Sequence, residues 1–404
     1  MQLNAFSLAL KSLWHRPLAT ALNLFLMAIG IAMMTFILSA SSQLTDRALR
    51  DAQGIDLVVG AKGSPLQLIL SSIYQIDAPT GNIPLATETQ LKQNRMVKTA
   101  IPLALGDSYR GFRIVGTNDD YIRHYNGQLA QGTLPTHSMH AVMGALVAQR
   151  TKAGIGNHFF GSHGLADGGD AHEEAAFEVV GILQPTGTVL DRLIITPVES
   201  VWKVHEKVDG LNPDDPEERE VMEQHRELTA LLVQYSSPLA AVTMPRFINS
   251  QPQLQAAQPA FESAKLFRLM GVGIDVLRGI AAIVLLAATL AMFVALYHAL
   301  EERRTDLAIL RTLGASPAKL LRLLLTEGLL LALLGAALGW LLGHATVGLL
   351  AQMMASEHNI VLSAWFIAAD EIWLLPLAIV IGIAAALLPA MRAYRTDIAT
   401  TLAH

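Results

Sequence analysis

Four apolar runs separated by polar segments dominate the pattern of hydrophobic and polar positions along this chain of 404 residues. The runs cover residues 18–41, 271–300, 320–350 and 372–391, and each is close to or above the roughly 20 apolar residues that cross a bilayer as a helix. The long segment between the first and second runs carries Pro, Gly and Asn turn signals and short β-rich stretches, which are typical of an α+β domain. The pattern therefore predicts four membrane spans and one large inserted domain.

The predicted fold class is a membrane α-helical protein with four transmembrane helices and a large extracytoplasmic α+β domain inserted between the first and second. In chain order, the predicted parts are a cytoplasmic interfacial helix (1–17), the first span with a stalk (18–44), the periplasmic domain (45–260), a second stalk with the second span (261–300), a cytoplasmic helix (301–319), the third span (320–352), a short periplasmic loop (353–371), the fourth span (372–392) and a cytoplasmic tail (393–404).

Within the inserted domain, β-rich runs predict strands at residues 55–59, 68–74, 99–105, 111–115, 177–183, 193–196 and 228–235. A helix is expected to begin at Pro216, where Asp215 would be the N-cap and Glu218 would complete a capping box.

Basic residues predict the orientation of the spans, because loops rich in Lys and Arg stay in the cytoplasm. Lys11 and Arg16 precede the first span, and Arg392 and Arg395 follow the last one. The loop at 353–371 has acidic residues but neither Lys nor Arg. We therefore expect a multi-pass membrane protein with both termini in the cytoplasm and the large domain on the opposite side of the membrane. The first run exceeds a typical signal-peptide core, which favours an uncleaved anchor.

Composition narrows the class of protein further. Hydrophobic residues make up 52% of the chain, the net charge is −5, and there is no cysteine. The acidic balance gives no reason to expect nucleic acid as a partner, and the lack of cysteine excludes disulfides, thiol catalysis and thiolate zinc sites. No phosphate-binding G-x-x-x-x-G-K-[ST] motif occurs, so any ATP that drives this protein would be hydrolysed by another chain.

The polar segment between the second and third runs reads EERRTDLAILRTLGAS, residues 301–316. Leu307, Leu310 and Leu313 recur at three-residue steps, which indicates an amphipathic helix. Gly314 then stops that helix shortly before the third span begins. We expect a short helix at the cytoplasmic mouth of the bundle, where it would contact a soluble partner.

This segment resembles the coupling segment of the FtsX/MacB-type permeases, also called type VII or mechanotransmitting ABC transporters. Their pattern runs roughly ERRxEIAxLRAxGAS and is followed by an apolar run that opens with Glu-Gly, which this chain has at Glu327 and Gly328. The chain departs from the pattern with Asp306 where the family usually carries Glu, a change that keeps the charge. The architecture extends the resemblance to nearly the whole chain.

The resemblance implies a non-catalytic permease subunit that converts ATP binding and hydrolysis by a separate ATPase into movement of its periplasmic domain. Export or extraction of lipoprotein, peptide or other periplasmic cargo is the implied use. The implied partners are a cytoplasmic ABC ATPase, a second permease copy in a homodimer, the lipid bilayer, and a periplasmic or outer-membrane protein; ATP and Mg would be bound by the ATPase and no cofactor by this chain. The residues expected to dock the ATPase are Glu301, Arg303, Arg304, Asp306, Leu310, Arg311, Leu313 and Gly314.

Three features of the third span are candidates for a role. Gly335, Gly339 and Gly343 form two overlapping G-x-x-x-G steps, which suit close packing either within the four spans or between two copies. Glu327 lies about one turn into the span, where a carboxylate is costly unless paired. We expect it to hold Arg304, Arg311 or the backbone of the preceding helix, with a solvated interfacial acid as the alternative. His344 fits a satisfied histidine better than a proton relay.

The inserted domain is rich in histidine, with His158, His163 and His172 in one Gly-rich stretch and His137 and His140 as a second pair. Imidazole and carboxylate groups suit zinc, although no rigid zinc motif is present and a solvated loop is the simpler interpretation. Two further functions therefore stay open. One is a zinc-linked transport permease, and the other is an FtsX-like scaffold that activates a periplasmic cell-wall hydrolase.

Overall fold

The computed structural model describes residues 5–163, 171–205, 226–303, 309, 312, 315–357 and 362–395. The chain divides into two compact units. The membrane unit comprises Met1–Leu44, Met270–Ser356 and Ile360–His404, and the inserted domain comprises Thr45–Leu269 with Glu357–Asn359. The helix that Pro216 was expected to begin lies outside the described residues.

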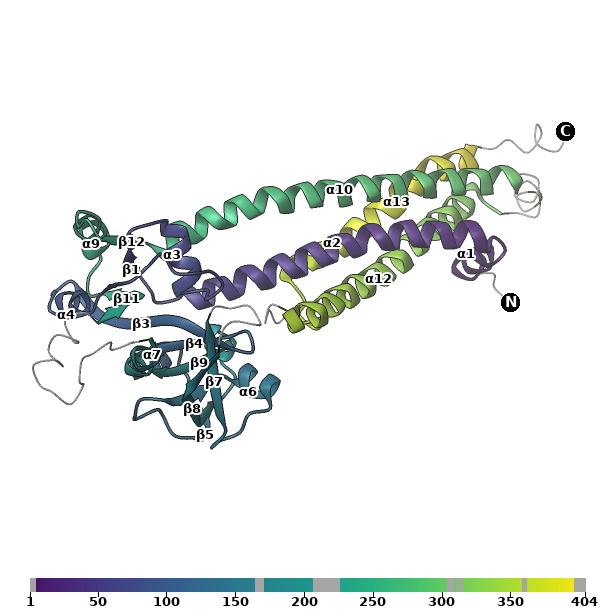
Figure 1. The fold of residues 1–404 in the computed structure, drawn as a ribbon. Helices are drawn as coiled ribbons and strands as arrows, with labels where there is room; N and C mark the ends of the chain where they lie inside the picture. The colour runs from purple at the N-terminus through teal and green to yellow at the C-terminus, as the bar shows by residue number, and fades with distance from the viewer. Residues whose placement is uncertain are drawn as a thin grey trace, which may run out of the picture. The chain divides into compact units, whose positions relative to one another are not determined.

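Four helices in the described part of the chain are long and apolar enough to cross a membrane. They are α2 (Pro17–Ala52), α10 (Pro259–Glu302), α12 (Pro317–Glu357) and α13 (Leu374–Arg395), the last preceded by the short helix η2 (Ala369–Trp373) (Figure 1). A short helix, α1 (Ala5–Trp14), precedes α2. The prediction of four spans with an α+β domain between the first and second is confirmed.

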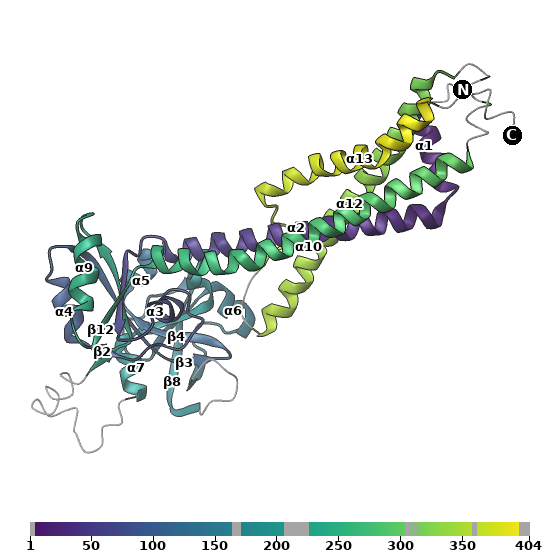
Figure 2. The same ribbon diagram turned by 90° about the horizontal axis from the view of Figure 1, so that it is seen from above.

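The four long helices share one apolar core in the membrane unit, to which α2, α10, α12 and α13 all contribute (Figure 2). Met27 of α2 and Met292 of α10 are fully buried in it, as is Ala378 of α13. Close approach depends on small residues. A Cβ placed on Gly328 of α12 would lie 2.8 Å from the carbonyl oxygen of Gly382 in α13, so neither helix can carry a side chain there without moving.

The inserted domain is built on a ten-stranded sheet with the strand order β12-β1-β11-β3-β4-β9-β6-β8-β5. Strand β7 pairs with both β3 and β8, so the pairing β3-β4-β9-β6-β8-β7 closes on itself as a ring. A separate ladder pairs β10 with β2. The strands are β1 (Leu57–Ala61), β2 (Ile83–Pro84), β3 (Val97–Tyr109), β4 (Phe112–Thr117), β5 (Leu129–Gly132), β6 (His140–Met143), β7 (His158–His163), β8 (Ala171–Leu183), β9 (Leu193–Pro197), β10 (Glu227–Leu228), β11 (Ala230–Tyr235) and β12 (Leu254–Ala257).

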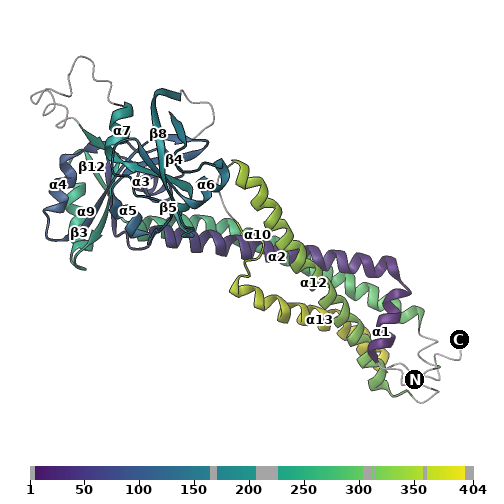
Figure 3. The same ribbon diagram turned by 90° about the horizontal axis from the view of Figure 1, so that it is seen from below.

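Helices cover both faces of this sheet (Figure 3). One apolar cluster joins the strands to α3 (Pro65–Ser72), α5 (Asp119–His124) and the end of α2. A second joins them to α4 (Ala86–Lys92), α7 (Val198–His205) and α9 (Ala240–Asn249). A third lies under α6 (Ala145–Thr151), and the short helix η1 (Val189–Arg192) leads into β9. The arrangement is an α+β domain with its core on both sides of the sheet.

The turn between β3 and β4 shows how local sequence fixes strand pairing. Arg110 and Gly111 both have positive φ, 50° and 75°, between the paired residues Tyr109 and Phe112. Two consecutive residues with positive φ make a two-residue hairpin turn whose twist matches the flanking strands, and glycine tolerates this conformation without strain.

One predicted strand is wrong. Residues 68–74 lie in and after the helix α3, not in a strand. Ser64 accepts a hydrogen bond from the backbone N–H of Gln67 at 3.4 Å, and Pro65 occupies the first helical turn, so the chain starts a helix there. The other six predicted strands overlap observed strands, whereas β2, β5, β6, β7 and β12 were not predicted.

Candidate functional site

A cluster of polar and charged side chains joins three helix ends in the membrane unit. Arg303, directly after α10, has its Nη1 3.6 Å from Oε1 of Glu327 in α12. Arg303 also donates a hydrogen bond to the hydroxyl of Ser12 in α1. Arg16, between α1 and α2, pairs with Glu302. We name these five residues the inner cluster, and they tie α1, the end of α10 and the start of α12 together.

Glu327 is the buried member of the inner cluster. Its side chain is 3% exposed, against 29% for Arg303. Leu324 and Leu331, three residues before and four after it, are also buried, so Glu327 lies on the inward stripe of α12. A buried carboxylate is strongly unfavourable without a counter-charge, and the charges of Arg303 and Arg16 supply it. These contacts pair Glu327, as expected, but with Arg303, which was not among the expected partners. The expected partners Arg304 and Arg311 lie outside the described residues.

The structure describes only part of the segment expected to dock an ATPase. Glu301 is exposed at the end of α10, and Arg303 belongs to the inner cluster. The other expected residues lie outside the described residues: Arg304, Asp306, Leu310, Arg311, Leu313 and Gly314. Sequence reasoning missed Ser12 and the pairing of Arg16 with Glu302. These contacts join residues 291 and 286 positions apart and leave no local signal.

The glycine ridge of α12 faces α2 of the same chain. The distances from an added Cβ to α2 are short at each glycine: 2.7 Å at Gly335 (to Met27 Cβ), 2.6 Å at Gly339 (to Ala28 O) and 2.6 Å at Gly343 (to Thr35 Cβ). Real Cβ atoms do not approach this closely. The contacts support the intramolecular alternative for this ridge, because α2 already occupies it.

A second buried cluster lies near the end of α12 that leads to η2. His344 Nδ1 lies 2.8 Å from the carbonyl oxygen of Ala364, and its Nε2 lies 2.9 Å from Oε2 of Glu371. Trp340 Nε1 donates to the same carboxylate oxygen at 2.8 Å, and the backbone N–H of Ala368 donates to the other at 2.9 Å. His344 is therefore a satisfied histidine. Glu371, which the sequence presents only as a loop acid, is its partner.

Within the inserted domain, the last turn of α2 is fastened by a buried aspartate. Asp51 Oδ1 accepts a hydrogen bond from the backbone N–H of Val189 at 2.6 Å, and Oδ2 lies 3.3 Å from Nη2 of Arg192. The hydroxyl of Tyr125 donates to the backbone oxygen of Asp51 at 2.9 Å. The start of α10 is fastened as well, because the hydroxyls of Tyr74 and Ser263 lie 2.7 Å apart.

Of the three histidines expected to bind zinc, only His158 has a described side chain. The side chains of His163 and His172 lie outside the described residues. His158 on β7 is paired with Glu178 of β8, and His140 on β6 is paired with the same Glu178 from the other side. Among the described residues, no group of three or more His, Cys, Asp or Glu is placed to hold a metal ion. Zinc binding stays a prediction that metal titration with His163 and His172 variants would test.

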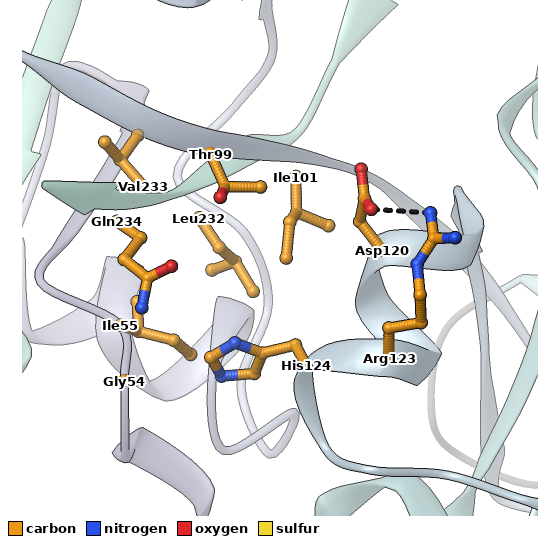
Figure 4. Close-up of a pocket in the computed structure, with 10 residues that line it drawn as sticks. All are labelled: Gly54, Ile55, Thr99, Ile101, Asp120, Arg123, His124, Leu232, Val233 and Gln234. Carbon is orange, nitrogen blue, oxygen red and sulfur yellow. Dashed lines mark hydrogen bonds and ion pairs between the residues drawn. The ribbon is translucent and has the colours of Figure 1, made fainter. Parts of the chain in front are cut away.

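A pocket of about 220 Å³ lies in the inserted domain beside the chain that leaves α2 (Figure 4). Its lining includes Gly54, the aliphatic side chain of Ile55, the ring of His124, and the ion pair between Asp120 and Arg123 at 2.7 Å. Burial lowers the pKa of His124, partly offset by a hydrogen bond to the backbone of Gln53. The ring thus favours its neutral form in the folded domain.

Comparison with known families agrees with this architecture. The family model of the MacB-like periplasmic core domain matches residues 20–242, and that of the FtsX-like permease C-terminal domain matches residues 278–398. No curated protein matches the chain. A solved structure described as the extracellular domain of the noncanonic ABC-type transporter YknZ from Gram-positive bacteria is 15% identical, with a TM-score of 0.30, and covers 50% of this chain and 99% of that chain.

The two family matches fall on the two parts that the fold separates. The first covers α2 and most of the inserted domain, and the second covers most of α10 with α12 and α13. The first match alone spans more than half of the chain. This protein therefore belongs to the FtsX/MacB-type ABC transporter permeases, as a membrane protein with four transmembrane helices and a large extracytoplasmic domain.

Proposed function

We propose that this permease converts ATP binding and hydrolysis by a separate ATPase subunit into movement of its extracytoplasmic domain. The observation that carries the proposal is the continuity of α2 and α10. Each is one unbroken helix that begins or ends in the membrane unit and continues into residues of the inserted domain. An α-helix of 44 residues, such as α10, is about 66 Å long and resists axial compression, so it can carry a displacement over that length.

The contacts at both ends of these helices support transmission of movement along them. At the inner end, the segment expected to receive the ATPase follows Arg303, which contacts Ser12 and Glu327. In the inserted domain, Asp51 and Ser263 hold the last turn of α2 and the first turns of α10. A push on the segment after Arg303 would therefore act on α10 and α12 together, and the domain would receive it through fixed contacts.

The distribution of buried ionisable groups favours a lever over a conduit. Among the described residues of the membrane unit, the buried ionisable side chains are Glu327, His344 and Glu371. They belong to the two clusters described above, so these residues do not form a polar line along the spans. We propose that cargo is handled outside the bilayer, as export or extraction of lipoprotein, peptide or other periplasmic material, by a homodimer in the bacterial inner membrane with both chain termini in the cytoplasm.

The test uses the lack of native cysteine, which permits labelling at one position only. A spin label at Gly154→Cys, where an added Cβ meets nothing within 4 Å, reports the distance between the domains of two copies. We expect this distance to change when a non-hydrolysable ATP analogue is added to the complex with the ATPase. Three glycines inserted after Gly273 in α10 should abolish the change and leave ATPase binding intact.

The matched control inserts three glycines after Thr136, in an exposed loop of the domain, and should keep the nucleotide-dependent change. Two results would reject the proposed function: purified permease that associates with no ATPase, or a distance change that persists after α10 is interrupted.

A further inference from the structure

The segment that connects α12 to α13 is bound to α2 as well as to α12. The side chain of Gln43 in α2 pairs with the backbone of Ser363: the Ser363 N–H donates to Oε1 at 2.8 Å, and Nε2 donates to the Ser363 oxygen at 3.1 Å. The hydroxyl of Ser39 donates to the carbonyl oxygen of Phe366 at 3.3 Å. Residues 362–373 therefore connect the two helices at the end of the membrane unit from which α2 continues into the domain.

The ring of His344 holds this segment to α12 and faces two acceptors. The carbonyl oxygen of Ala364, 2.8 Å from Nδ1, can only accept a hydrogen bond, so Nδ1 carries a hydrogen and donates it. Nε2 lies 2.9 Å from Oε2 of Glu371. That carboxyl group already accepts from the indole N–H of Trp340 and the backbone N–H of Ala368.

Because Nδ1 already donates, the contact between His344 and Glu371 needs one more proton. Either Nε2 is protonated and an imidazolium donates to a carboxylate, or Glu371 is protonated and donates to Nε2. In both arrangements the pair holds one proton more than a neutral imidazole beside a carboxylate.

Loss of that proton would leave two acceptor lone pairs facing each other at 2.9 Å. His344 is 8% exposed and Glu371 is 5% exposed, so water cannot separate them unless the segment moves. We propose that His344 and Glu371 form a proton-operated clasp: the protonated pair holds residues 362–373 on α12, and loss of the shared proton releases them.

The charges around the clasp are few. Asp370 is the neighbouring acid on η2, and its residue is exposed. From α2 the facing groups are the neutral Ser39 and Gln43. Between Glu327 and Glu357, α12 carries no Asp, Glu, Lys or Arg, and the acid and base in the middle of α10, Asp275 and Arg278, are paired with each other at 3.4 Å. The proton is therefore shared chiefly by His344 and Glu371.

The clasp can be tested with single cysteines in the full chain in lipid nanodiscs. Ala368 is 3% exposed and Ile367 is 62% exposed, so Ala368→Cys reports release of the segment and Ile367→Cys reports the pH dependence of the thiol reaction itself. The measured quantity is the ratio of their maleimide modification rates. If release requires loss of one proton, this ratio rises about tenfold per pH unit once the pair begins to deprotonate.

The matched variant is Glu371→Gln, whose amide nitrogen in the place of Oε2 would donate to Nε2 of a neutral His344 without an additional proton, at the cost of the hydrogen bond from Trp340. In this background the ratio should stay constant with pH. A constant ratio with the native pair between about pH 5.5 and 9.5 would overturn the clasp, as would the same rise in Glu371→Gln. If that variant does not fold, the clasp is tested instead by the pH dependence of hydrogen exchange of residues 362–373 in the unsubstituted protein. Protection that falls with pH after correction for intrinsic exchange supports the clasp, and constant protection rejects it.

Discussion

Nη1 of Arg303 lies 3.6 Å from Oε1 of Glu327, and the two side chains differ sharply in exposure, at 29% and 3%. The pair is therefore asymmetric: the carboxylate depends on the guanidinium, whereas the guanidinium also reaches water. We expect Arg303→Ala to destabilise the permease by about 3 kcal/mol, because it leaves a buried charge without its main partner. Glu327→Gln should cost less, since it removes that charge. Thermal unfolding of both variants in the same detergent measures the difference, and the reverse order would contradict this account of the pair.

The same pair predicts a functional effect. Glu327→Ala removes the contact through which α12 and the end of α10 hold each other. We expect the variant to bind the ATPase and to hydrolyse ATP, but to lose the nucleotide-dependent movement of the domain. ATPase activity and inter-domain distance, measured on the same reconstituted sample, separate the two effects. A variant that remains fully coupled would rule out a coupling role for Glu327.

The glycine ridge of α12 provides a graded packing test. Gly339→Ala would place a Cβ 2.6 Å from the carbonyl oxygen of Ala28, so α2 and α12 must separate. Overpacking of this kind costs about 1–3 kcal/mol. Gly279→Ala in α10 is the control, because nothing lies within 4 Å of its added Cβ and alanine favours a helix by up to about 1 kcal/mol. Unfolding of both variants is measured by SDS titration. The SDS fraction at the midpoint of unfolding should fall for Gly339→Ala and rise for Gly279→Ala.

The membrane part of the fold could be predicted because each span has its own length and composition signal. The long apolar helices α2, α10, α12 and α13 follow directly from this, and so does a separate domain between the first two. Residues 68–74, which read LILSSIY, were misassigned because short apolar runs of this kind fit a buried strand as well as a helix. The signal that decides is the capping pair Ser64 and Pro65.

The site contacts were harder to predict, because they join residues that are far apart in the chain. Sequence reasoning expected Glu327 to hold Arg304, Arg311 or the backbone of the preceding helix, and it did not include Arg303. Neither segment's sequence specifies how α10 and α12 are rotated relative to each other. His344 and Glu371 are 27 residues apart on different helices, so no helical spacing relates them. Pairing of this kind depends on how the spans pack, which hydropathy does not specify.

The fastening of α2 in the domain gives a further prediction. Asp51→Ala removes both the acceptor for the Val189 N–H and the partner of Arg192. Asp51→Asn keeps an oxygen for Val189 and loses only the charge pair. We expect Asp51→Ala to destabilise the domain by about 3 kcal/mol and Asp51→Asn by less. Hydrogen exchange of β11 in the full-length protein measures the domain alone, and equal effects of the two variants would contradict the role of the Val189 contact.

The last prediction concerns pH and His124, which lines the pocket beside the end of α2. Burial lowers the pKa of His124 in the folded domain below its unfolded value. The unfolded chain therefore binds more protons between the two values, and stability rises with pH in that interval. The contribution of the neutral His124 ring to the free energy of unfolding is fully present above the ordinary histidine pKa of about 6.5. It is lost as pH falls through the lowered pKa of the folded state.

Replacing the ring by an uncharged side chain, His124→Gln, should reduce the loss of domain stability below about pH 6.5, because no buried ring then has to gain a charge. Exchange of β11 amides in the full-length protein, measured at several pH values and corrected for intrinsic rates, gives the stability. His137→Gln is the matched control, since it removes an exposed imidazole from the same domain and should keep the native pH dependence. If His124→Gln and the unsubstituted protein lose stability equally on acidification, proton uptake by His124 does not oppose folding, and the acid sensitivity of the domain must arise from another group.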